Sequence, residues 1–422
     1  MNIDPNLYPD QREAVLKMAE FLEKPTLGSS FFTLQGYAGT GKTRCMHSMY
    51  QLFKDSKTKI LYSAPTNKAA KVLRTHTKEA ETIYKILNLR VDTTGELKTI
   101  VGTGKPDHLT EVDAIVLDEA SMVNRQLHTA LSENSEKYGL KIIFVGDKAQ
   151  LPPVKEKQSV VWERPADVSL EVVRRHDNAI LRFATEVREQ VFSNFPCITV
   201  TGDHTETEGV KKHSKQSFHN SILDAADSGV FIDGSTKIIS WRNAKVTAYN
   251  DIVRGAIHGA ISQTERWLPG DQIVAGAPCQ RGDNLLMSTD EEAVIQAVIP
   301  CKHPTEAQYQ AYELKAVTEM GKTVRLIVQH PATQAKFEND LQEIAHQAAS
   351  NGKLWRTFHQ KKELFHDIRH GYALTAHRAQ GSTWQQCFVD TQDILSNRFN
   401  RTEAFQCLYV ASTRPSRWLH LL

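Results

Sequence analysis

Gly36-Tyr37-Ala38-Gly39-Thr40-Gly41-Lys42-Thr43 fits the phosphate-binding pattern G-x-x-x-x-G-K-[ST] at every position. The apolar run at residues 30–35 before it predicts a buried strand, and residues 44–53 after it have the apolar spacing of a helix. The glycines allow backbone N–H groups to face a phosphate, and the helix N-terminus adds partial positive charge. In this geometry Lys42 reaches the β- and γ-phosphates and the Thr43 hydroxyl binds Mg²⁺. The segment therefore predicts a strand–loop–helix site for a nucleoside triphosphate.

The composition is that of a globular protein with several domains. The chain has 422 residues, of which 40% are apolar, and its net charge of +2 permits a nucleic-acid partner without requiring one. The six cysteines are scattered without a C-x-x-C pair, so we interpret them as reduced core thiols of a cytosolic protein rather than as disulfides or zinc ligands. No run approaches the ~20 apolar residues of a membrane span, and the N-terminus lacks the features of a signal peptide. We therefore expect no membrane partner.

The first part of the chain alternates strand-like apolar runs with helical patterns. Most of these runs are continuously apolar, as in a parallel sheet that is covered on both faces. Loops with chemically useful side chains follow three of them, at the carboxyl ends where open α/β sheets bind ligands. The predicted strands are residues 31–34, 59–64, 114–117 and 142–145.

Residues 88–110 interrupt this plan. Two short β-like pieces, 89–91 and 97–101, flank a turn-like segment at 92–95, which predicts a small hairpin inserted before the strand that precedes Asp118. This segment contains no aromatic residue.

The second part of the chain predicts another α/β unit that carries an insertion. Residues 172–192 have helical spacing, and a strand at 237–241 precedes a further helix. Short β-like pieces fill 271–330, residues 334–368 are helical in pattern and rich in basic side chains, and the α/β pattern returns at Tyr372. The fold class predicted is therefore α/β with two nucleotide-fold units and an inserted β-rich and helical segment.

Two acids end the apolar strand at 114–117. Asp118 can hold Mg²⁺ through water, and Glu119 can orient and activate an attacking water as general base. Acids at a strand end are often only solvated, but their position downstream of a phosphate loop favours the catalytic interpretation.

A third strand-to-loop element follows at residues 145–154. Its Gln150 can bond a γ-phosphate and sense the loss of that phosphate. A plain surface turn is the alternative, because Gly-Asp and Pro-Pro pairs favour turns.

Together these motifs resemble those of superfamily 1 DNA helicases, in order and spacing, and most closely the RecD-like branch. The second half of the chain supplies segments similar to helicase motifs V and VI, and the first half supplies segments similar to motif Ia and to the adenine-reading Q motif. The segments that carry the resemblance are Gln11, 36–43, 64–70, 118–121, 146–154, 374–382 and 408–414.

The resemblance implies two RecA-like P-loop domains with parallel sheets, and ATP with Mg²⁺ in the cleft between them. Residues 1–165 would form domain 1A with the 88–110 pin hairpin (1B), residues 166–270 and 371–422 would form domain 2A, and residues 271–370 would form an inserted domain 2B with an SH3-like β-barrel and a helical segment.

The resemblance also implies roles for individual residues. Arg414 and one of Arg174 and Arg175, for which we choose Arg175, would reach the nucleotide from the second domain as arginine fingers. The other expected catalytic residues are Lys42, Glu119 and Gln150; the expected nucleotide-binding residues are Gln11, Gly36, Ala38, Gly39, Thr40, Gly41, Lys42, Thr43, Asp118, Gln380 and Gly381, with Thr43 and Asp118 at the metal.

Single-stranded DNA would cross both domains on phosphate contacts and stacking side chains. The candidate residues are Pro65, Thr66, Asn67, Lys68, Trp241, Arg242, Asn243, Thr375 and His377. A core aromatic that closes its strand is an equally good interpretation of Trp241. The basic residues between 359 and 370 fit either a DNA-facing surface or a solvated helix face.

By resemblance the function expected is an ATP-dependent 5′→3′ DNA helicase that translocates on single strands and unwinds tailed duplex. We expect a monomer in the cytoplasm (the host cytoplasm if the source is a phage), with replication or single-strand-binding proteins as possible partners. Because the hairpin lacks an aromatic wedge, a DNA-stimulated translocase that remodels nucleoprotein without efficient unwinding is the alternative. A kinase would not need the second α/β unit, a transport ATPase would need an L-S-G-G-Q signature, and a nonhydrolysing binding module conflicts with Lys42, Asp118 and Glu119.

Overall fold

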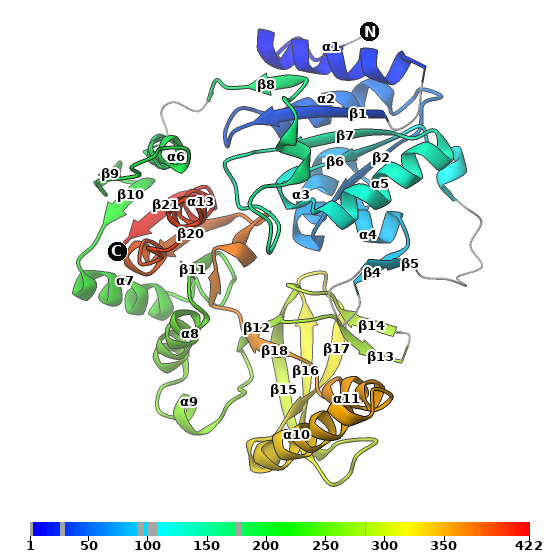
Figure 1. The fold of residues 1–422 in the computed structure, drawn as a ribbon. Coiled ribbons are helices and arrows are strands. Elements are labelled where there is room, and N and C mark those ends of the chain that lie inside the picture. Colours follow the sequence, from blue (N-terminus) through cyan, green and yellow to red (C-terminus); the bar gives the residue numbers. More distant parts are fainter. Residues whose placement is uncertain (1–2, 26–29, 92–96, 100–107, 174–178, 283) are drawn as a thin grey trace. The chain divides into compact units, whose positions relative to one another are not determined.

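A six-stranded, fully parallel sheet carries the phosphate loop in the computed structural model of the chain (Figure 1). The structure describes residues 3–25, 30–91, 97–99, 108–173, 179–282 and 284–422. The strand order is β3-β2-β6-β7-β1-β8. The strands are β1 (Ser30–Gly36), β2 (Ile60–Ala64), β3 (Glu81–Thr82), β6 (Ala114–Leu117), β7 (Lys141–Gly146) and β8 (Val168–Leu170).

Helices cover both faces of this sheet because alternate strand residues point to opposite sides. Val116 of β6 packs in one core with residues of helices α1, α2 and α3, whereas its neighbour Leu117 packs in a second core with residues of α4 and α5. The predicted parallel α/β sheet is therefore confirmed. The helices are α1 (Pro9–Glu23), α2 (Lys42–Phe53), α3 (Asn67–Thr77), α4 (Ile83–Ile86) and α5 (Arg125–Tyr138).

Two edge strands of this sheet were not predicted. β3 has two residues, and β8 has three, so neither forms a long apolar run. β8 pairs with β1 in parallel, which extends the first sheet to Leu170, beyond the expected domain boundary at residue 165.

The predicted hairpin is present as β4 (Leu89–Val91) paired with β5 (Leu97–Thr99) in antiparallel register, with Val91 opposite Leu97. The predicted turn at residues 92–95 and the end of the second predicted strand lie outside the described residues.

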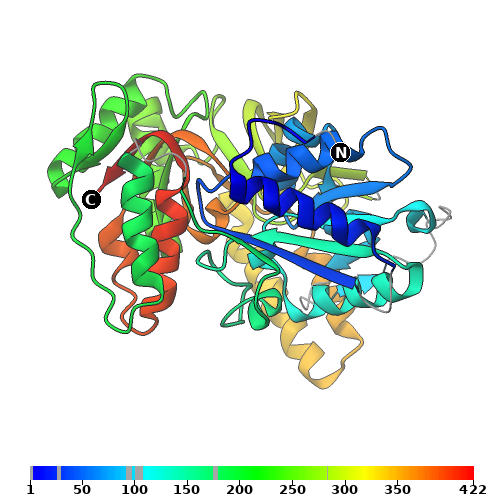
Figure 2. The ribbon, with the colours of Figure 1, turned by 90° about the horizontal axis from the view of Figure 1, so that it is seen from above.

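A second six-stranded sheet has the order β19-β11-β20-β21-β10-β9. β21 pairs in parallel with β20 and β10, and β9 is an antiparallel edge. Helices α6 and α13 lie side by side in both views (Figure 1, Figure 2). The strands are β9 (Asp203–His204), β10 (Gly209–Lys212), β11 (Thr236–Ser240), β19 (Ala373–Thr375), β20 (Trp384–Val389) and β21 (Pro415–Leu421); the helices are α6 (Ala179–Val191), α7 (Lys215–Asp227), α8 (Asn243–His258), α9 (Ile261–Thr264), α12 (Thr391–Ile394) and α13 (Arg401–Ser412).

The inserted segment forms a five-stranded antiparallel sheet of order β17-β16-β15-β12-β18, together with the two-stranded pair β13-β14. The helical pattern at 334–368 divides into two helices at Asn351-Gly352, and β18 follows the second. The elements are β12 (Gln272–Ala275), β13 (Cys279–Arg281), β14 (Asn284–Met287), β15 (Glu292–Lys302), β16 (Gln310–Thr318), β17 (Thr323–Gln329), α10 (Gln334–Ser350), α11 (Leu354–Lys362) and β18 (Ile368–His370).

The chain divides into two compact units. One comprises Met1–Ser214, Ile239–Arg242 and Thr375–Leu422, and the other comprises Lys215–Ile238 and Asn243–Leu374. The contacts described below for the nucleotide site lie within the first unit, and the ion pairs of the basic residues at 361–370 lie within the second. Among the described residues, no helix combines the length and the apolar character needed to cross a bilayer.

Candidate nucleotide and nucleic-acid site

The phosphate loop has the predicted strand–loop–helix form: β1 ends at Gly36, and α2 begins at Lys42. Gly41, at the N-terminus of α2, has a φ of 95°, a left-handed conformation that favours glycine. A Cβ atom there would also lie 2.2 Å from Nε2 of Gln11, so a side chain is excluded on both grounds.

Gln11 bonds to the phosphate loop through its side-chain amide. Its Nε2 donates to the Thr40 carbonyl at 2.9 Å, and its Oε1 accepts from the Tyr8 N–H at 3.3 Å. The side chain is buried, with 2% of its surface exposed. In this arrangement both ends of the amide are occupied within the protein, which gives the residue a structural role in addition to the adenine contact expected from resemblance.

The Lys42 side chain lies along the phosphate loop. Its Nζ donates to the carbonyls of Gly36 at 2.6 Å and Tyr37 at 3.1 Å. The hydroxyl of Thr40 caps the same turn by donating to the Tyr37 carbonyl at 2.8 Å. The loop is therefore held in shape by its own side chains, and the ammonium group lies against the carbonyls at the start of the loop.

Asp118 and Glu119 follow β6 directly. Burial and the neighbouring Glu119 charge raise the pKa of Asp118 to about 7, against the opposing effects of the Glu119 N–H and Lys42. The Glu119 N–H donates to Asp118 Oδ1 at 2.8 Å. Glu119 itself has a φ of 53°, an uncommon left-handed conformation for a residue with a side chain.

The hard oxygen donors of this site suit Mg²⁺. Asp118 offers a carboxylate and Thr43 a hydroxyl, the ligand types that this ion takes alongside water and phosphate oxygens. Because ionised carboxylate is the form that binds a cation, a nearby Mg²⁺ would oppose the raised pKa of Asp118.

The loop after β7 meets the phosphate loop through helix α13. The Tyr409 hydroxyl donates to Asp147 Oδ2 at 2.6 Å and accepts from the Ala38 N–H at 3.0 Å. Tyr409 is 1% exposed and Asp147 is fully buried. Burial and the Asp147 carboxylate raise the pKa of Tyr409 well above its ordinary value, so the hydroxyl stays protonated. One phenol thus joins three segments that are far apart in sequence.

Gln150 lies in the same loop. Its backbone carbonyl accepts from Gln406 Nε2 at 3.1 Å, and the adjacent Leu151 carbonyl accepts from Gln380 Nε2 at 3.2 Å. The Oε1 atom of Gln150 is buried and has no hydrogen-bond partner within the described structure. A buried polar atom of this kind is uncommon in native proteins and often marks a group whose partner is a ligand or water.

Arg414 is the expected arginine finger that the described residues include. Arg414 is 7% exposed and its guanidinium is held by its own surroundings: Nε donates to the Val410 carbonyl and an Nη to the Ser382 carbonyl. Another Nη donates to Thr413 Oγ1 at 2.8 Å, so the guanidinium is bonded on several sides. The expected finger Arg175 lies outside the described residues.

The motif Ia and motif V segments pack against each other. Thr66 caps α3 by accepting from the Ala69 N–H at 3.2 Å, and a Cβ atom at Gly381 would lie 3.0 Å from Cβ of Ala69. Lys68 Nζ lies 5.7 Å from the ring centroid of buried Trp384. Pro65 is buried and Asn67 is exposed. Of the predicted DNA-binding residues of the first domain, Thr66 and Lys68 thus lie beside the second-domain loop.

Asp393 organises the end of β11. Its Oδ2 accepts from the N–H groups of Trp241 and Arg242, each at 2.9 Å, and its Oδ1 accepts from Arg242 Nε at 2.5 Å. The Asp393 side chain is fully buried, whereas that of Arg242 is 53% exposed. Trp241 is half-buried and Asn243 begins helix α8 at the surface. The carboxylate therefore fixes the loop but leaves Arg242 open to solvent.

Thr375 and His377 lie at the carboxyl end of β19. Thr375 is buried and its Oγ1 accepts from the Arg378 N–H at 3.4 Å. His377 Nε2 lies 3.5 Å from Glu403 Oε1. Burial lowers the pKa of His377, with the Glu403 charge acting in the opposite direction.

Several residues that shape this site were missed from the sequence. Tyr409 and Asp147 lie inside recognised motifs, yet a tyrosine and an aspartate carry no spacing rule that pairs them. The guanidinium of Arg188 stacks at 4.0 Å on the ring of Tyr37 in the phosphate loop. Three residues of the predicted basic cluster face carboxylates: Lys361 faces Asp340, Arg369 faces Asp367, and His370 faces Asp271.

Comparison with known families gives two matches. Residues 6–194 match the family described as AAA domain, and residues 370–422 match the family described as UvrD-like helicase C-terminal domain. The first match includes the phosphate loop, Asp118, Glu119 and the loop after β7. The second match includes the segments that contain Gln380 and Arg414.

Individual proteins extend the similarity over the full chain. The chain is 26% identical to the ATP-dependent DNA helicase dda of Enterobacteria phage T4, covering 90% of this chain and 92% of that protein. It is 23% identical to the uncharacterized protein R530 of Acanthamoeba polyphaga mimivirus, covering 96% and 97%. In fold it is similar to the Pif1 helicase from Bacteroides, solved in complex with ADP-AlF3 and ssDNA, at a TM-score of 0.53 and 14% identity over 97% of this chain and 91% of that one.

Proposed function

Because the chain belongs to the RecD/Pif1-like group of superfamily 1 helicases, a family of ATP-hydrolysing enzymes, we propose that it is a 5′→3′ DNA helicase that moves along single strands and separates tailed duplex. The phage T4 relative is an ATP-dependent DNA helicase, and the Bacteroides Pif1 structure contains single-stranded DNA; both support this choice of substrate. The polarity rests on the family resemblance alone.

The observation that carries the proposal is the junction at Tyr409. Its hydroxyl contacts both the Ala38 N–H of the phosphate loop and the Asp147 carboxylate of the loop that holds Gln150. A helix of the C-terminal family match thus contacts the nucleotide loop of the N-terminal match. An ATP-driven motor needs such a contact, because hydrolysis in one domain must change the position or the contacts of the other.

In the proposed reaction Lys42 and the loop N–H groups hold the β- and γ-phosphates, and Thr43 and Asp118 hold Mg²⁺, which supplies charge neutralisation when bound. Glu119 orients the water and accepts its proton, and Gln150 bonds the terminal phosphate. Arg414 and Arg175 would act as arginine fingers that neutralise charge in the transition state, while Gln11, Gly36, Gly39, Gly41, Gln380 and Gly381 would shape the cleft.

The proposed DNA track runs over the residues that follow β2, β11 and β19. Thr66, Asn67 and Lys68 would contact one stretch of backbone, and Trp241, Arg242, Asn243, Thr375 and His377 the next. The half-buried position of Trp241 and the exposed guanidinium of Arg242 support a stacking and a phosphate contact, respectively.

The proposed domain division is 1A at 1–165 with the β4-β5 hairpin as pin, 2A at 166–270 and 371–422, and 2B at 271–370, with the 1A boundary moved to Leu170 because β8 pairs with β1. The antiparallel sheet of the insertion supports the description of 2B as an SH3-like barrel with helices α10 and α11 attached.

A translocase that strips or remodels nucleoprotein without efficient unwinding is the second candidate. The observation in its favour is the sequence of the hairpin segment, which has no Phe, Tyr or Trp to stack on the last base pair.

Lys42→Ala tests the ATPase assignment. We expect the variant to fold and to lose ATP hydrolysis with and without single-stranded DNA, because the phosphates lose their main cationic contact. Lys54→Ala, at the exposed C-terminal end of the same helix, is the matched control and should retain wild-type turnover. DNA-stimulated hydrolysis near the wild-type rate in folded Lys42→Ala would overturn the assignment.

A further inference from the structure

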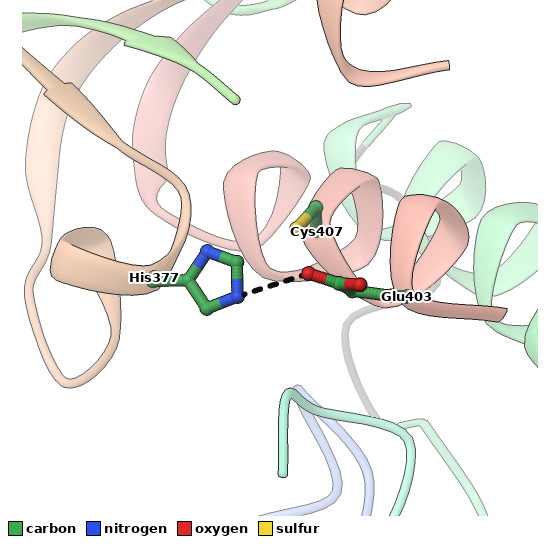
Figure 3. A group of neighbouring side chains, drawn as sticks. All are labelled: His377, Glu403 and Cys407. Atoms are coloured by element: carbon green, nitrogen blue, oxygen red, sulfur yellow. Dashed lines mark ion pairs between the residues drawn. The ribbon is translucent and has the colours of Figure 1, made fainter. Parts of the chain in front are cut away.

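Three side chains of different chemistry meet between the short 3₁₀ helix at His377–Ala379 and helix α13 (Figure 3). They are His377, Glu403 and Cys407, and their nitrogen, oxygen and sulfur ligand atoms all lie within 4.8 Å of one another. In the part of the chain that the structure describes, no other group of three His, Cys, Asp or Glu side chains converges in this way. The cluster takes no part in the nucleotide chemistry proposed above.

The helix places two of the three ligands on one face. Glu403 and Cys407 are four residues apart on α13, a spacing that brings side chains of successive turns together. Asn400 caps this helix by accepting from the Glu403 N–H at 3.1 Å, which fixes the backbone at the first ligand. His377 approaches the same face from the loop after β19.

The Glu403 carboxylate is oriented by a second layer of residues. Asn397 Nδ2 and Asn400 Nδ2 donate to its Oε2 at 3.4 Å and 3.1 Å. The other oxygen, Oε1, is turned toward His377 Nε2 at 3.5 Å. Amide donors that hold one carboxylate oxygen and leave the other facing a histidine are the kind of outer contacts that orient metal ligands.

The cluster is also reachable from solvent. The side chains of His377 and Glu403 are 37% and 30% exposed, while Cys407 lies buried beneath them. Two of the three ligand side chains are therefore accessible to an ion in solvent, while the sulfur is buried.

We propose that His377 Nε2, Glu403 Oε1 and Cys407 Sγ bind one Zn²⁺ ion, with water as the fourth ligand. Zinc takes four tetrahedral ligands of these three types at about 2.0–2.3 Å. That geometry places ligand atoms about 3.3–3.8 Å apart. The His377 and Glu403 atoms already have this spacing at 3.5 Å, so it is the Cys407 sulfur that must approach, by up to roughly 1 Å. The mixed sulfur, nitrogen and oxygen set selects zinc over Mg²⁺, which takes oxygen ligands.

Binding replaces a proton by the metal. The Cys407 Sγ–H bond breaks, the sulfur keeps the electron pair and bonds to zinc, and the proton passes to solvent. No electron is transferred in this step. The ion neutralises the two negative charges of thiolate and carboxylate, which the apolar surroundings of Cys407 would otherwise disfavour.

Zinc binding at this site would change how strongly single-stranded DNA stimulates ATP hydrolysis. This consequence rests on the proposed function, in which His377 contacts DNA. A metal-bound His377 cannot offer its Nε2 to a phosphate, so zinc should reduce the stimulation of ATPase by single-stranded DNA.

Cobalt(II) provides the direct test, because a tetrahedral cobalt–thiolate site has a sulfur-to-metal charge-transfer band and intense visible bands. We expect the metal-stripped, untagged full chain to bind one equivalent of cobalt with both signals, and zinc to displace it. Cys407→Ala should lose the charge-transfer band. Cys387→Ala, a buried cysteine of β20 outside the cluster, is the matched control and should keep it.

Glu403→Gln provides a second variant if Cys407→Ala does not fold. It keeps the size of the side chain and the backbone N–H that bonds to the capping residue Asn400. This variant should bind cobalt at least about tenfold more weakly. Absence of the charge-transfer band in the wild type, or its persistence in folded Cys407→Ala, would overturn the site. The spectra do not depend on hydrolysis, so their failure is distinguishable from failure of the helicase proposal. Zinc titration of each protein's ATPase, with and without DNA, then tests the regulatory consequence.

Discussion

Glu119, the proposed general base, has an uncommon backbone conformation. Its φ of 53° is a conformation that costs of order 1–3 kcal/mol for a residue with a side chain. The residue follows the buried strand β6 and starts a short 3₁₀ helix, so the surrounding structure holds it in place. The conformation turns the carboxylate away from the direction that an extended strand would give it.

Glu119→Gln should bind ATP and single-stranded DNA like the wild type but hydrolyse ATP about 10²–10⁴-fold more slowly, because the amide keeps the shape and removes the base. Single-turnover hydrolysis, measured beside equilibrium ATP binding, separates the two effects. Loss of ATP binding in the variant would instead indicate a structural role for this side chain.

Tyr409 is the residue on which the junction between the two family matches depends. In Tyr409→Phe, the buried Ala38 N–H and Asp147 carboxylate each lose a partner, so we expect a loss of about 1–3 kcal/mol in stability and a reduced kcat. Denaturant unfolding and steady-state ATPase measure the two quantities.

Tyr62→Phe is the matched control for this prediction. Tyr62 is a buried tyrosine of the first sheet whose hydroxyl has no hydrogen-bond partner in the described structure. Removing that hydroxyl should leave stability and turnover nearly unchanged. Equal effects of the two substitutions would show that the Tyr409 junction has no special role.

At the scale of elements, the two hairpin strands and the C-terminal strand have separable roles. The β4-β5 pair lies in sequence between β3 and β6, away from the loops that hold the nucleotide. β21 lies between β20 and β10, inside the second sheet. The first element should therefore affect unwinding, and the second should affect stability.

Replacement of residues 91–101 by a short Gly-Ser turn should abolish strand separation and leave DNA-stimulated ATPase largely intact. Only the obstacle that splits the duplex is removed, while both sheets remain. Because the segment has no aromatic side chain, single substitutions within it should have small effects. If the folded replacement unwinds tailed duplex at the wild-type rate, the hairpin is not the pin.

A buried histidine pair makes the second sheet sensitive to acid. His420 of β21 stacks on Phe388 and shares a hydrogen bond of 2.9 Å with His213, and burial together with the His213 and Lys211 charges lowers the pKa of His420 to about 3. The unfolded chain binds a proton near pH 6.5, whereas the folded chain does not until about pH 3. Stability is therefore complete above pH 6.5 and falls as pH decreases between these values.

The loss from this residue should reach about 2 kcal/mol at pH 5. His420→Leu removes the titrating group, so the difference in unfolding free energy between pH 8 and pH 5 should shrink by about this amount. Urea unfolding at both values measures it. An unchanged pH dependence in the variant would contradict the assignment.

At the scale of the whole molecule, much of the fold could be predicted because buried parallel strands are continuous apolar runs. β6 and β7 are examples, and the chemistry follows them at their carboxyl ends. The short strand β8 was missed because three residues that alternate in burial give no such run.

Other parts of the site could not be predicted because they depend on tertiary contacts. The Tyr409–Asp147 bond joins residues 262 apart in sequence, and the amide of Gln11 turns to a carbonyl in the phosphate loop. Arg414 is bonded to carbonyls of its own domain, a position that motif matching does not specify. Sequence motifs thus identify the candidate functional residues, whereas tertiary packing determines which groups each of them contacts.

The most direct test of the central claim compares duplexes with a 5′ or a 3′ single-stranded tail, with ATPase measured in the same reactions. We predict hydrolysis that is strongly stimulated by single-stranded DNA, with strand separation of the 5′-tailed duplex only. Stimulated hydrolysis without separation of either duplex would favour the translocase instead. Hydrolysis that is indifferent to DNA, or separation of the 3′-tailed duplex only, would contradict the proposed 5′→3′ helicase.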